Sequence, residues 1–407
     1  MRLLFISEVY TPWQGGAIVA IRNLMRQLTK NSHDVSIITG EKRKRWRVWG
    51  ERVEYDEECK AKVYRIPAIP YPFNTMATMT LPDRAGIKKI ILKEKPDCIH
   101  IFSPIGIAEK IAMSLAKKMH IPVVVTNHIM PENFTYNVKL PRSLQNLADK
   151  LIYEDLISFC NQAKVVTAPT KTAIDILLKH GLQTRHVAVT NGVDAEFFHP
   201  GKPKEDTLNR FNLDKKNKHI LYVGRLDGEK RVDLLIQAMP FILKKIPQAK
   251  LLIAGKGLQL EHLGQLVTEL QLKESVAILG KVSEEEKLGL LQTCDIFSIA
   301  SPSELQCISC LEALSCGLPI VVADQMALRE LTDENRNGLQ FSYPHAEELA
   351  DKTCKLLEDD QLRETCGKNG REWILNNHQL SQALHMFEKI YEQAIAENVS
   401  SSSDTNA

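Results

Sequence analysis

Features that would mark a membrane-spanning or secreted protein are missing from this 407-residue sequence. Its apolar runs stay well short of the ~20 residues that a bilayer-spanning helix needs. The N-terminus passes from Met1 and Arg2 straight into a strand-like segment, where a signal peptide would have a longer apolar stretch. We therefore expect a cytoplasmic protein.

Sequence motifs that are typical of metal-dependent sites are also missing. The chain has no D-x-D, no H-E-x-x-H and no P-loop sequence. Its nine cysteines, an odd number scattered from Cys59 to Cys366, suit reduced thiols better than a disulfide framework. Cys307 and Cys310 have C-x-x-C spacing, but no partner ligands lie at zinc-site spacing. We interpret them as small buried apolar residues at a helix start, and we expect neither a metal nor another cofactor.

Charge of neither sign dominates the composition. There are 52 Lys and Arg residues and 50 Asp and Glu residues, which leaves a formal net charge of +2. This balance gives no overall drive toward nucleic acid or acidic lipids. Local clusters must therefore carry any argument for such partners.

Apolar runs rich in branched residues alternate with segments of helical period, which is typical of βαβ units around a parallel sheet. At ~150 residues per domain, the length suggests two or three domains, and we expect two. In the first half, the expected strands are 3–6, 35–39, 98–102, 123–126 and 165–168, with a helix at 17–29. After a polar, turn-rich hinge at 196–217, the pattern restarts with strands at 219–223, 251–254, 276–279, 296–299 and 320–322. These features predict an α/β protein of two Rossmann-like, doubly wound domains, residues 1–195 and 196–379.

The last part of the chain has a different pattern. Helical periodicity runs from 347 to about 396, and a serine-rich segment follows it. Because such a segment buries little apolar surface, we expect residues 397–407 to be a disordered tail.

Glycines and basic side chains follow two of the expected strands. Gly15 and Gly16 precede the first helix, where backbone N–H groups can approach an anion closely. Arg225 and Lys230 follow the strand 219–223, and both suit a diphosphate. The carboxyl ends of parallel strands are where such sheets bind ligands. The structural alternatives are a plain tight turn at the glycines and a solvated loop around the basic residues.

Two glutamates eight positions apart straddle a later helix start. Glu304 lies in the preceding loop, and Glu312 lies about two turns into the helix. The apolar residues around them make these carboxylates candidates for ligand binding, because glutamates can accept hydrogen bonds from sugar hydroxyls. His128, at the end of strand 123–126, is a further candidate. A structural role is the alternative for this histidine.

Taken in this order, the motifs resemble family 4 of the retaining glycosyltransferases, which have the GT-B fold. The resemblance runs from Gly15 and Gly16 through Arg225 and Lys230 to the two glutamates. It implies two Rossmann-like domains that face a central cleft, and metal-independent transfer of a sugar from a nucleotide diphosphate. It also implies that a C-terminal helix, 380–396, crosses back onto the N-terminal domain.

The resemblance assigns roles to single residues. Arg225 and Lys230 would hold the diphosphate and Glu312 the ribose, while Glu304 and His128 would face the transferred sugar. The catalytic set is therefore His128, Glu304, Arg225 and Lys230. The donor-binding set adds backbone and base contacts and comprises Gly15, Gly16, Gly224, Arg225, Lys230, Gly280, Val282, Glu304, Gln306, Cys307, Ile308 and Glu312.

Two positions depart from the family pattern. The family usually has glycine where this chain has Cys307, so the backbone at the edge of the sugar site is expected to be less open. Residues 325–329 replace a glycine-rich turn, which leaves that loop without an assigned role.

Within the family, the phrases at 126–133 and 303–306 resemble enzymes that glucosylate diacylglycerol. We therefore expect a UDP-sugar donor, with glucose as the sugar, and a membrane lipid such as 1,2-diacylglycerol as acceptor. Members that act on phosphatidylinositol or build glycans share these phrases. A GT-B sugar-nucleotide epimerase and a catalytically idle binding protein are the rivals from other classes, and the pair Glu304 and Glu312 favours transfer. The sequence does not indicate an oligomeric state.

A basic run with interleaved tryptophans follows the second strand and consists of Lys42, Arg43, Lys44, Arg45, Trp46, Arg47 and Trp49. Such a run suits an anionic membrane, at about 1 kcal/mol per basic residue, and predicts a peripheral position at the inner face of the cell membrane. The apolar segment 69–81 is the candidate lipid-facing mouth. The alternative is a solvated loop neutralised by acidic residues at 54–58. No nucleic-acid motif supports RNA binding.

Overall fold

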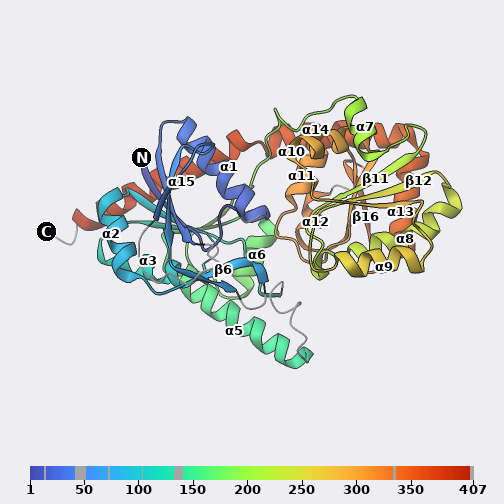
Figure 1. The fold of residues 1–407 in the computed structure, drawn as a ribbon. Coiled ribbons are helices and arrows are strands. Elements are labelled where there is room, and N and C mark those ends of the chain that lie inside the picture. The colour runs from blue at the N-terminus through green and yellow to red at the C-terminus, as the bar shows by residue number, and fades with distance from the viewer. Residues whose placement is uncertain are drawn as a thin grey trace. The chain divides into compact units, whose positions relative to one another are not determined.

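The computed structural model describes residues 1–12, 15–41, 52–71, 74–102, 104–132, 141–332 and 336–403. The chain divides into two units, each built around its own sheet (Figure 1). Unit 1 consists of Met1–Asn191 and Leu380–Ala407, and unit 2 consists of Gly192–Gln379. The division therefore falls a few residues before the boundary at 195 and 196 that the sequence suggested.

The main sheet of unit 1 has eight strands in the order β10-β9-β8-β7-β1-β2-β4-β3. Neighbouring strands are parallel, except that β3 runs antiparallel to β4. The strands are β1 (Arg2–Ile6), β2 (Asp34–Gly40), β3 (Arg52–Asp56), β4 (Ala61–Ile66), β7 (Cys98–Phe102), β8 (Val123–Thr126), β9 (Val165–Ala168) and β10 (His186–Ala188). All five strands predicted in this half are present, and β3, β4 and β10 are additions.

The helices of unit 1 are α1 (Gly16–Lys30), α2 (Arg84–Glu94), α3 (Ile107–Lys118), α5 (Arg142–Cys160), α6 (Lys171–Lys179) and α15 (Leu380–Ser403). A separate antiparallel hairpin, β5 (Ala68–Tyr71) and β6 (Asn74–Thr80), occupies most of the segment proposed as a lipid-facing mouth. The seven residues of the basic run lie outside the described residues.

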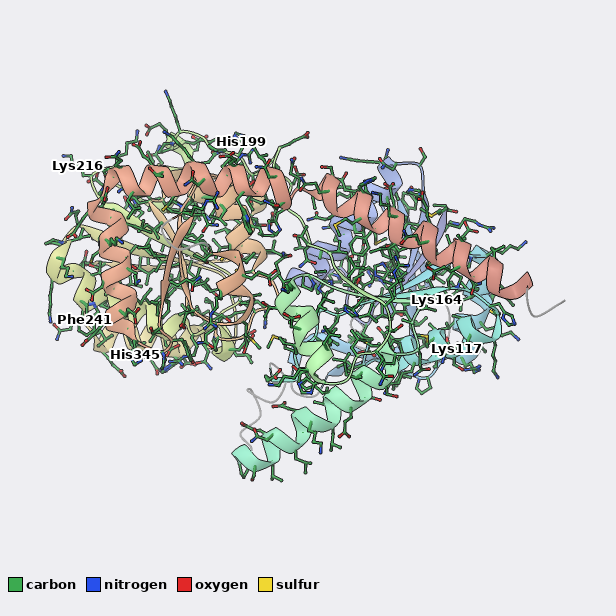
Figure 2. All side chains as sticks on the ribbon, turned by 180° about the vertical axis from the view of Figure 1, so that it is seen from behind. Lys117, Lys164, His199, Lys216, Phe241 and His345 are labelled. Atoms are coloured by element: carbon green, nitrogen blue, oxygen red, sulfur yellow. The ribbon has the colours of Figure 1, made fainter. Side chains whose placement is uncertain are left out.

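The C-terminal helix α15 packs beside α1 on the sheet of unit 1, as the view from behind shows (Figure 2). Leu384, Phe387, Tyr391 and Ala394 recur at helical spacing and are buried in the unit 1 core. Full burial of a large apolar side chain contributes about 1.5–3 kcal/mol. This apolar stripe is the reason that the helix belongs to unit 1.

The expectation that residues 397–407 are disordered was wrong for 397–403, because α15 continues to Ser403. Two contacts anchor the added turn. Arg185 forms an ion pair with Glu397 at 3.0 Å, and the Asn398 amide donates to the His120 carbonyl at 2.6 Å. Composition alone did not reveal these polar contacts to other parts of unit 1.

The sheet of unit 2 has six parallel strands in the order β13-β12-β11-β14-β15-β16. They are β11 (Lys218–Val223), β12 (Ala249–Ala254), β13 (Val276–Gly280), β14 (Ile296–Ile299), β15 (Ile320–Ala323) and β16 (Gly338–Phe341). The five predicted strands of this half are present, and β16 is an addition. Strands such as β14 and β15 are buried along their whole length, which explains their continuous apolar sequence.

The helices of unit 2 are α7 (Glu205–Phe211), the 3₁₀ turn η1 (Gly228–Lys230), α8 (Val232–Lys245), α9 (Leu260–Glu269), α10 (Glu284–Thr293), α11 (Ile308–Ser315), α12 (Met326–Leu331), α13 (Ala346–Glu358) and α14 (Asp360–Asn377). Helix α7 lies within the stretch predicted as a hinge. Along the sheet, the chain goes from β11 to one side through β12 and to the other side through β14. Open α/β sheets bind ligands at such a switch point.

Candidate active site

The switch point of unit 2 brings together a lysine and a glutamate from two segments. Lys230 ends the turn η1, which follows β11, and Glu304 lies between β14 and α11. Lys230 Nζ donates to Glu304 Oε1 at 2.6 Å. Burial alone would lower the pKa of Lys230, but the charge and hydrogen bond of Glu304 outweigh it, and the pKa lies above its ordinary value. Lys230 is therefore positively charged at pH 7, and it follows the carboxyl end of β11.

Arg225 is held by two acidic side chains of its own loop. Its guanidinium forms ion pairs with Asp227 and with Glu229, whose Oε1 lies 2.6 Å from Arg225 Nη2. Burial opposes the charge of Arg225, yet the two carboxylates raise its pKa. Glu229 Oε2 is buried and has no hydrogen-bond partner among the described residues. An incoming anion would compete with these carboxylates for Arg225.

Position 224 requires a glycine because the Tyr222 side chain lies close to the backbone there. The Tyr222 hydroxyl donates to the Arg225 carbonyl at 2.6 Å and thereby passes over Gly224. A Cβ at position 224 would lie only 2.7 Å from this hydroxyl oxygen. The glycine therefore lets Tyr222 fix the loop that carries Arg225.

Glu312 has a cationic partner that the sequence did not reveal. The buried Lys287 of α10 donates to Glu312 Oε1 at 2.8 Å and also lies 2.9 Å from Glu284. Burial raises the pKa of Glu312, and the charge of Lys287 opposes that rise. A buried carboxylate needs a counter-charge, but nothing in the spacing indicates which lysine supplies it.

Helix α11 begins beside Glu304. Gln306 and Cys307 are buried, Ile308 is half-buried, and Cys307 occupies the N-cap position of the helix. Cys307 has a φ of −87°, which suits any L-amino acid, so replacing the family's glycine does not strain the backbone. Among the described residues, no side chain caps α11 and no acidic residue lies in its first turn. The helix N-terminus therefore favours a bound anion.

Gly280 and Val282 lie at the end of β13. Gly280 has a φ of +71°, which favours glycine, and its carbonyl accepts from the Gly255 N–H at 2.7 Å. Val282 is half-buried and packs against the unit 2 core. Unit 2 therefore contains ten of the predicted donor-binding residues, which are Gly224, Arg225, Lys230, Gly280, Val282, Glu304, Gln306, Cys307, Ile308 and Glu312.

Gly15, Gly16 and His128 belong to unit 1. Gly16 begins α1, and the Gly15 carbonyl accepts from the Val19 N–H at 3.1 Å. Burial lowers the pKa of His128 to about 4, so this histidine is neutral at pH 7. Its ring stacks on Phe102 with 6.2 Å between centroids. A pocket in unit 1 contains His128 and is lined by Ala20, Asn23, Leu24, Gln27, Phe102, Asn191, Leu380, Ala383, Leu384 and Phe387.

Two family comparisons divide the chain as the structure does. Residues 14–197 match the family described as Glycosyltransferase Family 4, and residues 203–373 match the family described as Glycosyl transferases group 1. The matched segments lie on either side of the division between Asn191 and Gly192, apart from a few residues.

Curated relatives are similar over most of their length. An alpha-monoglucosyldiacylglycerol synthase of Acholeplasma laidlawii is 25% identical over 377 residues, which cover 91% of this chain and 91% of the relative. The sulfoquinovosyl transferase SQD2 of Arabidopsis thaliana is 26% identical, over 91% of this chain and 69% of its own. An alpha-monoglucosyldiacylglycerol synthase of Streptococcus pneumoniae is 22% identical, over 85% of this chain and 76% of its own.

Solved structures show the same fold. Sucrose-phosphate synthase from Thermosynechococcus elongatus matches with a TM-score of 0.78 at 20% identity, covering 97% of this chain and 99% of that chain. Anabaena HepE in complex with UDP-glucose matches with a TM-score of 0.72 at 20% identity, covering 98% of this chain and 99% of that chain. The predicted GT-B fold is confirmed, and the family matches on both units establish that this protein is a glycosyltransferase of family 4.

Proposed function

We propose that the protein transfers a hexose, with glucose as the favoured sugar, from a UDP-sugar to a membrane lipid such as 1,2-diacylglycerol, with retention of configuration. The observation that carries the proposal is the Lys230–Glu304 ion pair at the switch point of unit 2. It places a cation and a carboxylate, 2.6 Å apart, beside the uncapped N-terminus of α11. A departing diphosphate and a sugar rich in hydroxyls need those two kinds of group.

In this proposal the donor's charge is met by protein cations. Lys230 and Arg225 bind the diphosphate together with the N-terminus of α11, and Glu312 accepts from the ribose hydroxyls. Gly280 and Val282 lie along the base. Because two cations and a helix dipole supply positive charge, the transfer needs no divalent ion.

Glu304 binds the sugar hydroxyls in this scheme. Retention often involves a carboxylate nucleophile, but Glu304 is already engaged with Lys230. In this scheme the acceptor attacks the sugar on the same face from which the phosphate leaves. The leaving phosphate takes the acceptor's proton. His128, which is neutral at pH 7, contributes a hydrogen bond to the transferred sugar in this scheme.

A lipid acceptor is supported by an exposed apolar face on α5. Leu144, Leu147 and Leu151 recur at i, i+3 and i+7 and are 50%, 53% and 56% exposed. None of the described side chains from 141 to 152 is buried, and this part of α5 extends away from the rest of unit 1 (Figure 1). An exposed apolar stripe on a helix suits a lipid surface.

The proposed location is the cytoplasmic face of the cell membrane. In the part of the chain that the structure describes, no helix has the length and apolar composition to cross a bilayer. Contact through α5, and through the basic run 42–49, would let the protein reach a lipid whose hydroxyl group lies at the membrane surface. Relatives named for making glucosyldiacylglycerol support this choice of acceptor.

The test uses radiolabelled UDP-glucose and vesicles of phosphatidylglycerol with or without 1,2-diacylglycerol. We expect UDP release that depends on diacylglycerol, with label in the organic phase. UDP release only with another donor or with a soluble acceptor would overturn the lipid proposal. Addition of EDTA is expected to change the rate less than about twofold, and a loss that Mg²⁺ restores would contradict metal independence.

A further inference from the structure

The C-x-x-C pair lies at the first turn of α11. Cys307 occupies the N-cap position of α11, and Cys310 lies in the first turn of this helix. The Cys310 N–H donates to the Cys307 carbonyl at 3.1 Å. The neighbouring Cys307 side chain adds to the effect of burial in raising the pKa of the Cys310 thiol. Cys310 is fully buried and Cys307 is 5% exposed, so Cys307 is the outer member of the pair.

This dithiol lies beside the proposed donor site. The charges of Lys230 and Glu304 both act on the Cys310 thiol, and Cys307 acts on Lys230. Only two residues, Leu305 and Gln306, lie between Glu304 and Cys307 along the loop that leads into α11. A covalent change at Cys307 would therefore alter the surroundings of the Lys230–Glu304 ion pair and of the N-terminus of α11.

A metal site does not account for the pair. Among the described residues, no group of three or more His, Cys, Asp or Glu side chains is placed to hold a metal ion. A disulfide can instead form between two cysteines that have two residues between them at a helix N-terminus.

We propose that Cys307 and Cys310 form a reversible disulfide with a peroxide as oxidant, and that the disulfide lowers glycosyl transfer by disturbing the donor site. The second half of this inference rests on the proposed function. The first half does not depend on it, because disulfide formation can be observed without any substrate.

The chemistry balances with hydrogen peroxide as the oxidant. The Cys307 thiolate attacks one peroxide oxygen, the O–O bond breaks, and Cys307 sulfenic acid and water form. The Cys310 sulfur then attacks the Cys307 sulfur, the S–O bond breaks, and a second water leaves. Two electrons and two protons pass from the thiols to one peroxide. A dithiol reductant reverses the oxidation by exchange.

The effect on the donor site follows from disulfide geometry. An S–S bond is about 2.05 Å long, which is much shorter than a thiol hydrogen bond. Forming it draws the two sulfur atoms together and shifts the loop between Glu304 and Cys307. Because catalytic geometry is sensitive to shifts of about 1 Å, we expect transfer to fall at least tenfold.

The experiment treats the full-length protein with hydrogen peroxide and then with dithiothreitol. Peptide mass spectrometry should show a Cys307–Cys310 link, with transfer from UDP-glucose at least tenfold lower and restored by the reductant. Cys310→Ala should keep its untreated activity and lose the reversible response. Cys316→Ala, a buried cysteine at the other end of α11, is the matched control and should respond like the wild type.

Two further measurements keep the outcomes separate. Cys307→Gly removes the other thiol, and its treated and untreated rates should be equal. UDP affinity, measured by calorimetry for the reduced and oxidised protein, reports on the donor site even if no acceptor is found. Absence of the Cys307–Cys310 link, or a link that changes neither UDP affinity nor transfer, would overturn the inference.

Discussion

Lys230 Nζ lies 2.6 Å from Glu304 Oε1, although the two residues are 74 positions apart in the chain. The contact forms because β11 and β14 are neighbours in the sheet, so the loops that follow them meet at the same edge. The pair is shielded from water, with 15% and 9% of the side chains exposed. Removing either partner leaves the other without its counter-charge.

Lys230→Met should therefore affect both stability and turnover. We expect a loss of about 3 kcal/mol in the free energy of unfolding, because the Glu304 carboxylate remains buried and unpaired. Turnover should fall about 10²–10³-fold, the usual cost of removing one group that stabilises developing negative charge. Urea unfolding and initial rates measure the two effects. Turnover within twofold of the wild type would remove Lys230 from the proposed mechanism.

Lys287→Met tests the partner of Glu312. Without Lys287, Glu312 loses its 2.8 Å contact, and we expect the Kd for UDP to rise about tenfold with a loss of several kcal/mol in stability. Lys245→Met is the matched control, because its ion pair with Asp351 is exposed and such pairs contribute little to stability. Calorimetry with UDP gives the comparison. Equal UDP affinity in the two variants would argue against a ribose-binding role for Glu312.

The pH dependence of stability should reveal the burial of His128. Its pKa is about 4 in the folded protein, below the ordinary 6.5, so between these values the unfolded chain binds a proton that the folded protein does not. Stability from this group is therefore complete above pH 6.5 and is lost as the pH falls, at about 1.4 kcal/mol per pH unit. Urea unfolding of the wild type and His128→Gln should show the wild type losing roughly 2 kcal/mol relative to the variant between pH 7 and pH 5. A constant difference would mean that His128 is not buried in this way.

Replacing Leu144, Leu147 and Leu151 together by serine tests the membrane face of α5. Binding to vesicles of phosphatidylglycerol should weaken at least tenfold, because each leucine contributes apolar area to the lipid contact. UDP affinity and stability should change little, since these side chains are exposed. Leu258→Ser is the control, as Leu258 is 67% exposed in unit 2. Unchanged vesicle binding by the triple variant would direct attention to other surfaces.

Much of the fold could be predicted from sequence because parallel strands buried on both faces are continuous apolar runs. All ten expected strands are present, including β14 and β15. Strand β3 was missed because its residues are mostly exposed and polar, so no apolar run marks it. The extension of α15 to Ser403 was missed because contacts such as Arg185 with Glu397 lie far apart in sequence.

Part of the arrangement of the predicted site residues follows from the sequence, and their roles stay predictions. Positions of Arg225, Lys230 and Glu304 at strand ends follow from the sequence pattern, and the structure places Lys230 and Glu304 in contact. The pairing of Glu312 with Lys287 could not be predicted, because it depends on how α10 and α11 pack. A buried carboxylate indicates that some cation is near, and only the fold identifies it.

The most direct test of the account compares label transfer by the wild type and by Glu304→Gln. Both proteins receive radiolabelled UDP-glucose and vesicles that contain 1,2-diacylglycerol, and UDP affinity is measured on the same samples. We predict label in the lipid phase with the wild type, a rate at least about 100-fold lower with the variant, and UDP affinity within about threefold. Equal transfer by the two proteins, or no lipid label from the wild type, would contradict the account.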